Sequence, residues 1–535
     1  MLLVQMKSLR ALYTLLFGVA VLLFFGLAYP HHLHYQEQYQ LFLFDSTYVW
    51  DIIRLPGGIA DLLGRFCTQF FLFAWVGAAI IAVLLVVVQL LMLRLVSFGR
   101  LYGLSFVPSF LLWLFLLDEN ALLGGVWAVI LMQLAIWLYV RLPKGWMRFI
   151  VILATIPILY WMVGPAWNGG HYHRYPTVVP ALLYAAWITA IVLPLVVRAC
   201  KKWANDSHSS TLFSHVSFLL VAICMGLFVW KNANYKAEKV MQYDFMARHQ
   251  QWNRILSTIK DEKPKNQIGV TVQNLALAMR GMLADHLFEY HQNGIAGLLP
   301  DVERDATSPL PTAEAFYQLG MVYVAQRTVF EAQEAILDFQ KSARCYKRLA
   351  QTNLILGNYE VARKYLAALQ KTLFYREWAT KTLPLLGDEE AIAKHPEYGH
   401  LRQFAYDENF YFSDHVTPEM LQSLFFGNTD NRLAYEYLMA YYLLMGDLEN
   451  FANYVGWGEK LGYPAIPRHF QEALALKWSF GHEQNEQLSA LVSPAIAQRF
   501  SQFYSYLKSP AATTEGLAQN FGDTYWYYYF TSIKR

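Results

Sequence analysis

The chain has 535 residues, of which 56% are hydrophobic and 16% are charged, and its formal net charge is +3. Soluble globular proteins carry about 25% charged residues, so this composition argues against an ordinary soluble enzyme. Intrinsic disorder requires low hydrophobicity together with high net charge, and the chain has neither. The small net charge also argues against a nucleic-acid partner, because nucleic-acid-binding domains are strongly basic.

Long apolar stretches occupy residues 1–232, and the sequence has none of comparable length after them. A helix needs about 20 predominantly apolar residues to cross a bilayer. We therefore predict a transmembrane domain over 1–232 with seven spans, in contact with the lipid bilayer. The predicted spans cover residues 9–30, 71–97, 101–117, 121–141, 147–164, 178–199 and 212–231.

The positions of Lys and Arg in the short loops predict how the spans are threaded. Cationic residues such as Lys7, Arg100, Lys144 and Lys202 stand in four segments outside the spans, and these segments fall on one side of a seven-span threading. The positive-inside rule makes that side cytoplasmic. We expect a multi-pass membrane protein with a cytoplasmic N-terminus and with residues 233–535 on the opposite side, which is the periplasm for a protein of a bacterial inner membrane.

The first outer loop, residues 31–70, is longer than a simple connector and is rich in aromatic residues. We expect short helices at the membrane interface, broken at the Pro56-Gly57-Gly58 sequence. The loop carries the carboxylates of Glu37, Asp45 and Asp51, and a carboxylate can activate an acceptor hydroxyl. These three residues are candidate catalytic groups, and a structural role at a helix end is the alternative for each of them.

The loop between the fifth and sixth predicted spans lies on the same side and contains His171, His173 and Arg174. Arg binds phosphate in a bidentate manner, and His can donate a hydrogen bond or carry a proton. We predict these residues as candidates for binding a lipid phosphate, with simple solvation at a span end as the alternative. For Asp118 and Glu119, which face the same side, helix-end roles are expected.

The sequence contains no motif that identifies a cofactor. His31, His32 and His34 lack the spacing of a metal site, and an interfacial role is expected for them. Walker A, HExxH, GxSxG and CxxC sequences are all missing. We therefore expect no cofactor, and a divalent metal remains an open possibility.

Residues 233–535 follow the periodicity of amphipathic helices, without a convincing alternating strand. Three segments share the tetratricopeptide spacing, with turns at Gly320, Gly357 and Gly446. The predicted fold is therefore all-α: a polytopic membrane domain of about seven helices, then a soluble, periplasmic tetratricopeptide-like α-solenoid. The aromatic cluster at 525–530 is interpreted as a capping helix, with membrane anchoring as the alternative.

A repeat solenoid offers a concave surface to a peptide or a partner protein. The three repeat segments contain Tyr323, Tyr359 and Tyr442, one in each. We predict them as candidate groove residues that bind a protein partner.

Four features suggest a family: the stretch from Glu37-Gln38 to Phe42, the Pro56-Gly57-Gly58 turn, the stretch from Phe66 to Phe71 with Gln69, and the repeat-rich outer domain. With these features the whole chain resembles an uncharacterised membrane-protein family of Bacteroidota. The resemblance implies location and architecture, and no activity.

The architecture is also similar to that of GT-C membrane glycosyltransferases, which have a seven-span core and a long first outer loop with interfacial helices. In that class a loop carboxylate acts as general base or metal ligand, and the donor is a polyprenyl-phosphate sugar. The similarity implies a carboxylate role for Glu37, Asp45 or Asp51, and phosphate binding by His171 or Arg174. The chain departs from the class in two respects. It lacks an adjacent acidic pair in the first loop, and it has no further spans to complete a cavity for the lipid substrate.

Two function hypotheses follow from these patterns. The first is GT-C-like transfer of a sugar from a polyprenyl-phosphate donor at the periplasmic face. The second is a non-enzymatic, membrane-anchored tetratricopeptide scaffold that binds a partner protein in secretion or assembly of the cell envelope. An enzyme should lose function when Glu37 or Asp45 is replaced, whereas a scaffold should fail when groove residues near Tyr323 or Tyr359 are altered.

Overall fold

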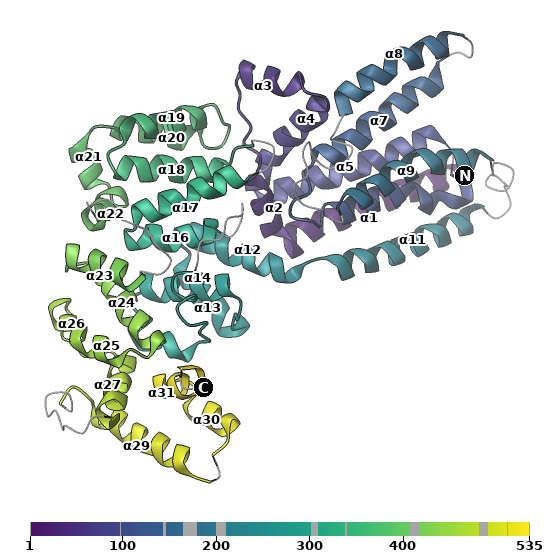
Figure 1. Cartoon of the computed structure of the whole chain (residues 1–535). Helices are drawn as coiled ribbons and strands as arrows, with labels where there is room; N and C mark the ends of the chain where they lie inside the picture. Colours follow the sequence, from purple (N-terminus) through teal and green to yellow (C-terminus); the bar gives the residue numbers. More distant parts are fainter. Residues whose placement is uncertain are drawn as a thin grey trace. The chain divides into compact units, whose positions relative to one another are not determined.

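The computed structural model describes residues 2–96, 98–142, 146–163, 179–199, 210–300, 309–336, 340–406, 417–480, 490–510 and 512–533. Across these ranges the regular secondary structure is helical, apart from one isolated bridge between Asn293 and Ile295. The all-α prediction is therefore confirmed (Figure 1).

The chain divides into two compact units. The first comprises Met1–Met241, Ile336–Lys347 and Leu366–Lys381. The second comprises Gln242–Ala335, Arg348–Tyr365 and Thr382–Arg535. Two short segments from the C-terminal half thus belong to the same unit as the apolar helices.

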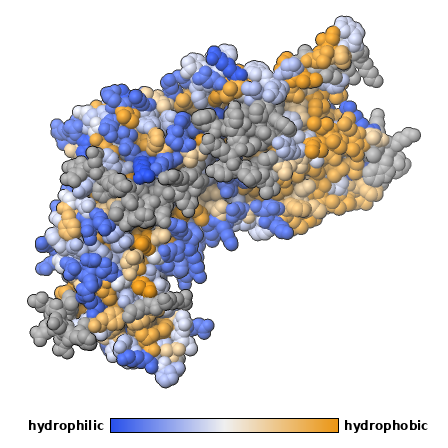
Figure 2. Space-filling model, viewed as in Figure 1, coloured by the Kyte–Doolittle hydropathy of each residue, from blue (hydrophilic) through white to orange (hydrophobic). Residues whose placement is uncertain are grey.

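Long apolar helices make up most of the first unit, and Figure 2 shows hydrophobic residues gathered over them. The α-helices that lie wholly in this unit, long and short, are α1 (Leu2–Leu23), α2 (Pro30–Glu37), α3 (Ser46–Ile53), α4 (Gly58–Thr68), α5 (Ala74–Leu95), α6 (Val107–Phe115), α7 (Gly124–Arg141), α8 (Trp146–Val163), α9 (Val179–Ala199) and α11 (Ser210–Asn232). Three shorter turns complete the unit: a π-helical turn, η1 (Phe24–Ala28), and the 3-10 helices η2 (Gln69–Leu72) and η3 (Gly99–Phe106).

Within the described residues, five helices are long and apolar enough to cross a membrane. Their apolar ranges are Leu9–Ala28, Ala74–Leu95, Gly124–Arg141, Ala181–Ala199 and Leu212–Asn232. These helices support a membrane protein, but the predicted number of seven spans is wrong by this criterion.

The third predicted span divides into η3 and α6, because Leu101 has non-helical backbone angles and α-helix begins only at Val107. The nine residues of α6 extend about 14 Å, against a hydrocarbon core of about 30 Å. The fifth predicted span corresponds to α8, an 18-residue helix with Pro157 inside it. Its apolar range among the described residues is Phe149–Met162, which does not meet the same criterion.

A glycine allows η3 to pack closely against α11. A Cβ atom at Gly103 would lie 2.1 Å from the carbonyl oxygen of Ser217. The N–H of Gly103 donates a hydrogen bond to Ser217 Oγ at 3.1 Å. Small residues at helix contacts in membranes permit this kind of backbone approach.

The second unit is built from shorter helices. They are α13 (Trp252–Glu262), α14 (Gln267–Met279), α15 (Leu283–His286), η5 (Leu287–Glu289), α16 (Pro309–Leu319), α17 (Val322–Ala335), η7 (Leu383–Leu385), α21 (Glu389–Lys394), α22 (Tyr398–Phe404), α23 (Thr417–Gly427), α24 (Arg432–Met445), α25 (Leu448–Tyr454), α26 (Trp457–Lys460), α27 (Arg468–Phe480), α29 (Pro494–Lys508), α30 (Thr514–Phe521), α31 (Tyr525–Tyr528) and η8 (Tyr529–Ile533). The unit boundaries fall inside α12 (Tyr235–Arg248), α18 (Ala343–Ile355), α19 (Tyr359–Gln370) and α20 (Arg376–Thr382).

Each predicted repeat segment forms a helix pair joined by a tight turn. Gly320, Gly357 and Gly446 occupy these turns with φ values of +88°, +78° and +73°. Glycine adopts positive φ without the steric cost that a Cβ imposes, so the turn positions are explained. A regular solenoid built from these pairs remains a prediction.

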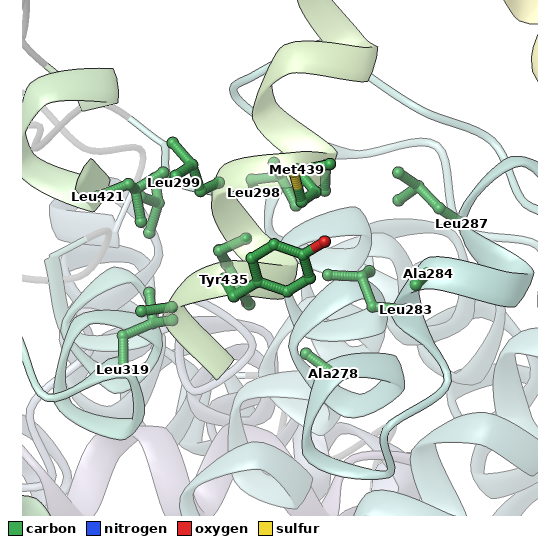
Figure 3. Packing of buried hydrophobic residues seen from close by; sticks show 14 of the residues in the cluster. Ala278, Leu283, Ala284, Leu287, Leu298, Leu299, Leu319, Leu421, Tyr435 and Met439 are labelled. Carbon is green, nitrogen blue, oxygen red and sulfur yellow. The ribbon is translucent and has the colours of Figure 1, made fainter. Parts of the chain in front are cut away.

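Helix α24 is the central packing element of the second unit. Ten of its side chains are buried, and Tyr435 and Met439 lie among leucines and alanines from other parts of the second unit (Figure 3). The C-terminal aromatic segment packs into the same cluster, with Tyr525 and Trp526 fully buried. Trp526 Nε1 donates to the carbonyl of Glu472 at 2.7 Å, which ties the segment to α27, and its role as a capping helix remains a prediction.

Candidate functional site

The first outer loop folds into short helices, as the sequence predicts. Helices α2, α3 and α4 are separated by an extended stretch and by the turn at Pro56-Gly57-Gly58. Gly57 has a φ of +82°, and a Cβ at Gly58 would lie 2.0 Å from the carbonyl oxygen of Ile52. Only glycines fit this turn, which sets the direction of α4 after α3.

Glu37 ends α2 and is 3% exposed. Its Oε1 accepts a hydrogen bond from the hydroxyl of Tyr375 at 2.9 Å. The neighbouring Gln38 accepts a hydrogen bond from Arg344 at 3.1 Å through its Oε1. The end of α2 is therefore bonded to residues that lie more than 300 positions later in the chain.

Asp45 is the N-cap of α3. Its carboxylate accepts hydrogen bonds from the backbone N–H groups of Thr47 at 2.9 Å and Tyr48 at 3.3 Å. It also forms an ion pair with Lys371. The hydrogen bond from Lys371, followed by those from Thr47 and Tyr48, holds the pKa of Asp45 well below its usual range, so the carboxylate stays ionised.

The backbone of the loop is bound to the same part of the chain. The N–H of Leu41 donates to the carbonyl of Lys341 at 2.8 Å, and that of Phe44 donates to the carbonyl of Lys371 at 2.7 Å. The ring of Phe374 contacts Phe70 and Phe73, with centroids 5.5 and 5.3 Å away. We call Ile336–Lys347 and Leu366–Lys381 the docked segments.

The three candidate carboxylates have different surroundings. Glu37 and Asp45 bind the docked segments, whereas the side chain of Asp51 is 75% exposed and lies 4.0 Å from Arg54. Structural partners therefore occupy the first two, and only Asp51 is open to solvent. Their catalytic assignment remains a prediction.

His171, His173 and Arg174, the candidate phosphate-binding residues, lie outside the described residues. Among the residues that are described, no three His, Cys, Asp or Glu side chains are grouped as metal ligands would be.

Glu238, in the first turn of α12, holds the start of α2. Its two carboxylate oxygens accept the backbone N–H groups of His31 at 2.7 Å and His32 at 2.8 Å. Burial raises the pKa of Glu238 to about 7, although these two hydrogen bonds oppose the shift. Sequence reasoning missed this residue, because an acidic residue in the first turn of a helix is ordinary.

The predicted groove tyrosines also differ in setting. Tyr323 is half-buried beside a space of about 10 Å³, which holds little more than one water molecule. Tyr359 donates to Glu389 and accepts a hydrogen bond from Arg402 at 3.0 Å. Tyr442 is 2% exposed and accepts a hydrogen bond from Gln422. Their assignment to one partner-binding groove remains a prediction.

A larger pocket of about 320 Å³ opens at the start of α24. Its walls come from the end of α14, the end of α16, helix α22 and the first turns of α24. Ala278 and Leu319 belong both to this wall and to the cluster shown in Figure 3. We call this space the α24 pocket.

The polar lining of the α24 pocket centres on Glu436, which is 2% exposed. Glu436 Oε1 accepts hydrogen bonds from Tyr463 at 2.7 Å and from Arg432 Nε at 2.9 Å. Its other oxygen, Oε2, is buried without a hydrogen-bond partner within the described structure. Burial raises the pKa of Glu436, although Tyr463 and Arg432 oppose the shift.

Asn431 supplies a second unsatisfied group. Its Oδ1 caps α24 by accepting the N–H of Ala434 at 3.0 Å. Its Nδ2 is buried and has no partner within the described part of the chain. Buried polar atoms without partners are costly, and both residues line the α24 pocket. The only sequence signal for this site is the Arg432/Glu436 spacing of i,i+4.

A family model described as "Family of unknown function (DUF6057)" matches residues 5–168 and 165–532 of the chain. No curated protein and no solved structure matches it.

Proposed function

The chain belongs to the DUF6057 family, and from that premise we propose that it is a membrane-anchored protein that binds a partner protein through the α24 pocket. The apolar helices of the first unit hold it in the membrane, and the second unit carries the binding site. The proposal is the scaffold hypothesis, with the α24 pocket in place of the predicted groove.

The observation that carries the proposal is the α24 pocket itself, an opening of about 320 Å³ in the second unit. Apolar side chains such as Leu319, Leu401 and Phe404 line it, together with the charged residues Asp430, Arg432 and Glu436. Pockets for specific ligands are largely apolar and contain a few placed polar groups, and the α24 pocket has this character.

The settings of Glu37 and Asp45 favour binding over catalysis. Each carboxylate is engaged by the docked segments, through Tyr375 and Lys371 respectively. A general base must reach its substrate's proton, so a carboxylate that is buried or ion-paired with the protein itself is poorly placed for this role.

We propose the bacterial inner membrane as the location, with the second unit in the periplasm. The five apolar helices support membrane insertion. Lys and Arg residues before the first, after the second and after the fourth of these helices fall on one side and support the orientation, whereas those at 141–148 fall on the other side of a five-span threading.

Site-specific photocrosslinking in intact cells tests the binding proposal. A photoreactive residue at the exposed position His400, which lines the pocket, should form a discrete adduct with one protein. The same residue at Glu360, whose side chain is 83% exposed on α19, serves as the matched control. The adduct should be lost when Glu436→Gln is added. Equal adducts from both positions, or none from His400, would contradict the proposal.

Lipid-linked sugar transfer is a second candidate, favoured by the exposure of Asp51 alone. In that case Asp51→Asn should abolish transfer of a radiolabelled sugar from a polyprenyl-phosphate donor to membranes that contain the protein. Arg54→Gln, which alters the neighbouring side chain, is the control.

A further inference from the structure

The turn between α19 and α20, residues 371–375, lies against the start of an apolar helix. The ring of Phe374 contacts Phe73, the residue immediately before α5, with centroids 5.3 Å apart. Helix α5 is one of the helices that are long and apolar enough to cross a membrane. Where α5 enters the bilayer, its first residues lie at the boundary between hydrocarbon and headgroups, so the turn lies at this depth too.

A second contact fixes the same depth. Trp75, in the first turn of α5, packs on Gly26, where a Cβ atom would lie 2.6 Å from the indole ring. Gly26 stands near the end of the first apolar range, Leu9–Ala28. The end of one apolar helix and the start of another therefore meet at Trp75, as they would at one face of a bilayer.

A chain of aromatic rings joins the turn to the first outer loop at this boundary. Phe66 contacts both Phe44 and Phe70, with centroids 6.5 and 5.6 Å away. Phe70 in turn contacts Phe374 at 5.5 Å. Phe44, Phe66 and Phe73 are 46%, 39% and 50% exposed. Exposed apolar patches mark interaction surfaces, and aromatic side chains gather where a protein meets the membrane interface.

The fold of the turn keeps Leu373 exposed. Thr372 is buried, and its hydroxyl donates to the carbonyl of Leu369 at 2.7 Å and accepts the N–H of Tyr375 at 3.1 Å. The hydroxyl of Tyr375 donates to Glu37. Leu373 lies between these anchored residues and is 45% exposed. A fixed turn therefore exposes a leucine next to the last ring of the aromatic chain.

Cationic residues flank the turn. Lys371 pairs with Asp45, and Arg376 is exposed, with its Nε donating to the carbonyl of Gln370 at 2.9 Å. Apolar side chains beside a guanidinium are typical of segments at the membrane interface, because the apolar groups reach the acyl chains while arginine stays among the lipid phosphates. Water is an unfavourable neighbour for these apolar side chains, and the bilayer around α5 can cover them.

We propose that the 371–375 turn is a membrane-contact site, in which Leu373 enters the acyl region of the bilayer around α5 and Arg376 lies among the lipid phosphates. The proposal rests on the membrane anchoring in the proposed function and does not involve the α24 pocket. It gives the docked segment Leu366–Lys381 a lipid partner in addition to the first outer loop.

Quenching of a fluorescent label by lipids tests the proposal. The full chain, with its native cysteines replaced, carries an NBD label at Leu373→Cys in nanodiscs whose phosphatidylcholine bears a nitroxide on the acyl chain near the headgroup. We expect a loss of fluorescence at this position and none at Val361→Cys. Val361 is the matched control, because it is 41% exposed and lies about 14 Å along α19 from Gln370. No loss at position 373, or equal losses at both positions, would overturn the proposal.

A label within α5 separates the proposal from the membrane anchoring on which it rests. Val83 is 60% exposed and lies about 14 Å along the helix from Ala74, near the middle of a hydrocarbon core of about 30 Å. The label at Val83→Cys should lose fluorescence when the nitroxide stands near the end of the acyl chain. A loss at position 83 without a loss at position 373 would reject the membrane contact of the turn alone. No loss at position 83 would reject the anchoring and the contact together.

A measurement on the unlabelled chain covers the case in which the label displaces the turn. Photoactivatable phosphatidylcholine in the same nanodiscs should form adducts with Leu366–Lys381 of the wild-type chain. Leu373→Asp should remove these adducts, because a carboxylate is costly to place in hydrocarbon. Missing adducts in the wild-type chain, or adducts that Leu373→Asp leaves unchanged, would overturn the proposal.

Discussion

Glu37 shows how one residue can have a role that its neighbours in the sequence do not reveal. Its carboxylate is buried and receives the hydroxyl of Tyr375, which stands 338 positions away. An aromatic loop with several acidic residues suggests a catalytic site when only the sequence is considered, whereas Glu37 and Asp45 bind a distant segment in the structure. A buried acceptor requires a donor, and Tyr375 supplies it.

The contribution of this bond can be measured directly. Tyr375→Phe removes the hydroxyl and keeps the ring, so we expect faster amide hydrogen exchange in Leu366–Lys381, by about tenfold. Exchange in α24 should not change. Tyr504→Phe, at a ring that is 39% exposed, is the control. Unaltered exchange in the docked segment would show that Glu37 does not hold it.

Glu238 should make the first unit sensitive to pH. Burial raises its pKa to about 7 in the folded protein, above the value of 4.5 expected when unfolded. A raised carboxyl pKa means that the folded state binds the proton more tightly, so its stabilising contribution is complete below pH 4.5 and is lost as the pH rises through about 7.

Thermal unfolding in detergent between pH 4 and pH 8 tests this expectation. The melting temperature should fall as the pH rises across that range, and Glu238→Gln should flatten the dependence. Glu390→Gln, at an exposed pair with Lys394, is the control. A wild-type profile that rises toward pH 8, or one that Glu238→Gln leaves unchanged, would contradict the role of burial.

At the scale of elements, the turn glycines explain why the helix pairs form where the sequence predicts them. Gly357 and Gly446 have nearly equal positive φ values, of +78° and +73°. They differ in their surroundings, because a Cβ at Gly357 would meet nothing within 4 Å, whereas one at Gly446 would lie 2.9 Å from Ile533 Cγ2 and 3.2 Å from Tyr529 Cε2.

This pair separates backbone strain from packing. Gly357→Ala should lower the free energy of unfolding by about 1 kcal/mol, which is the backbone cost alone. Gly446→Ala should cost more, because Ile533 and the C-terminal segment must also shift. Denaturant unfolding followed by tryptophan fluorescence measures both. Equal losses would mean that the C-terminal segment adapts without cost.

Helix length explains the difference between seven predicted spans and five. Hydropathy detects an apolar stretch, but it does not show where the backbone changes from 3-10 helix to α-helix. Such a change occurs between η3 and α6. The stretch at η3 and α6 is apolar as predicted, but its α-helix is too short to cross a bilayer.

At the scale of the whole molecule, the proposed orientation is open to a direct test. In a chain whose native cysteines are replaced, Glu360→Cys should react with a membrane-impermeant maleimide in spheroplasts. Lys7→Cys should react only after the membrane is disrupted, because the N-terminus is expected in the cytoplasm. The opposite labelling pattern would reverse the orientation and place the α24 pocket in the cytoplasm.

The sequence by itself determined the all-helical class, the apolar character of the N-terminal half, and the turns at Gly57, Gly320, Gly357 and Gly446. These features depend on local periodicity and on backbone angles, and both can be inferred from residues that are close together in the sequence. The tertiary structure alone decided the partners of Glu37 and Asp45, which stand 338 and 326 positions away. It also decided that one side-chain atom of Glu436 and one of Asn431 are buried without a hydrogen-bond partner among the described residues. Whether a polar atom finds a partner depends on which distant segments pack against it, and no local pattern contains that information.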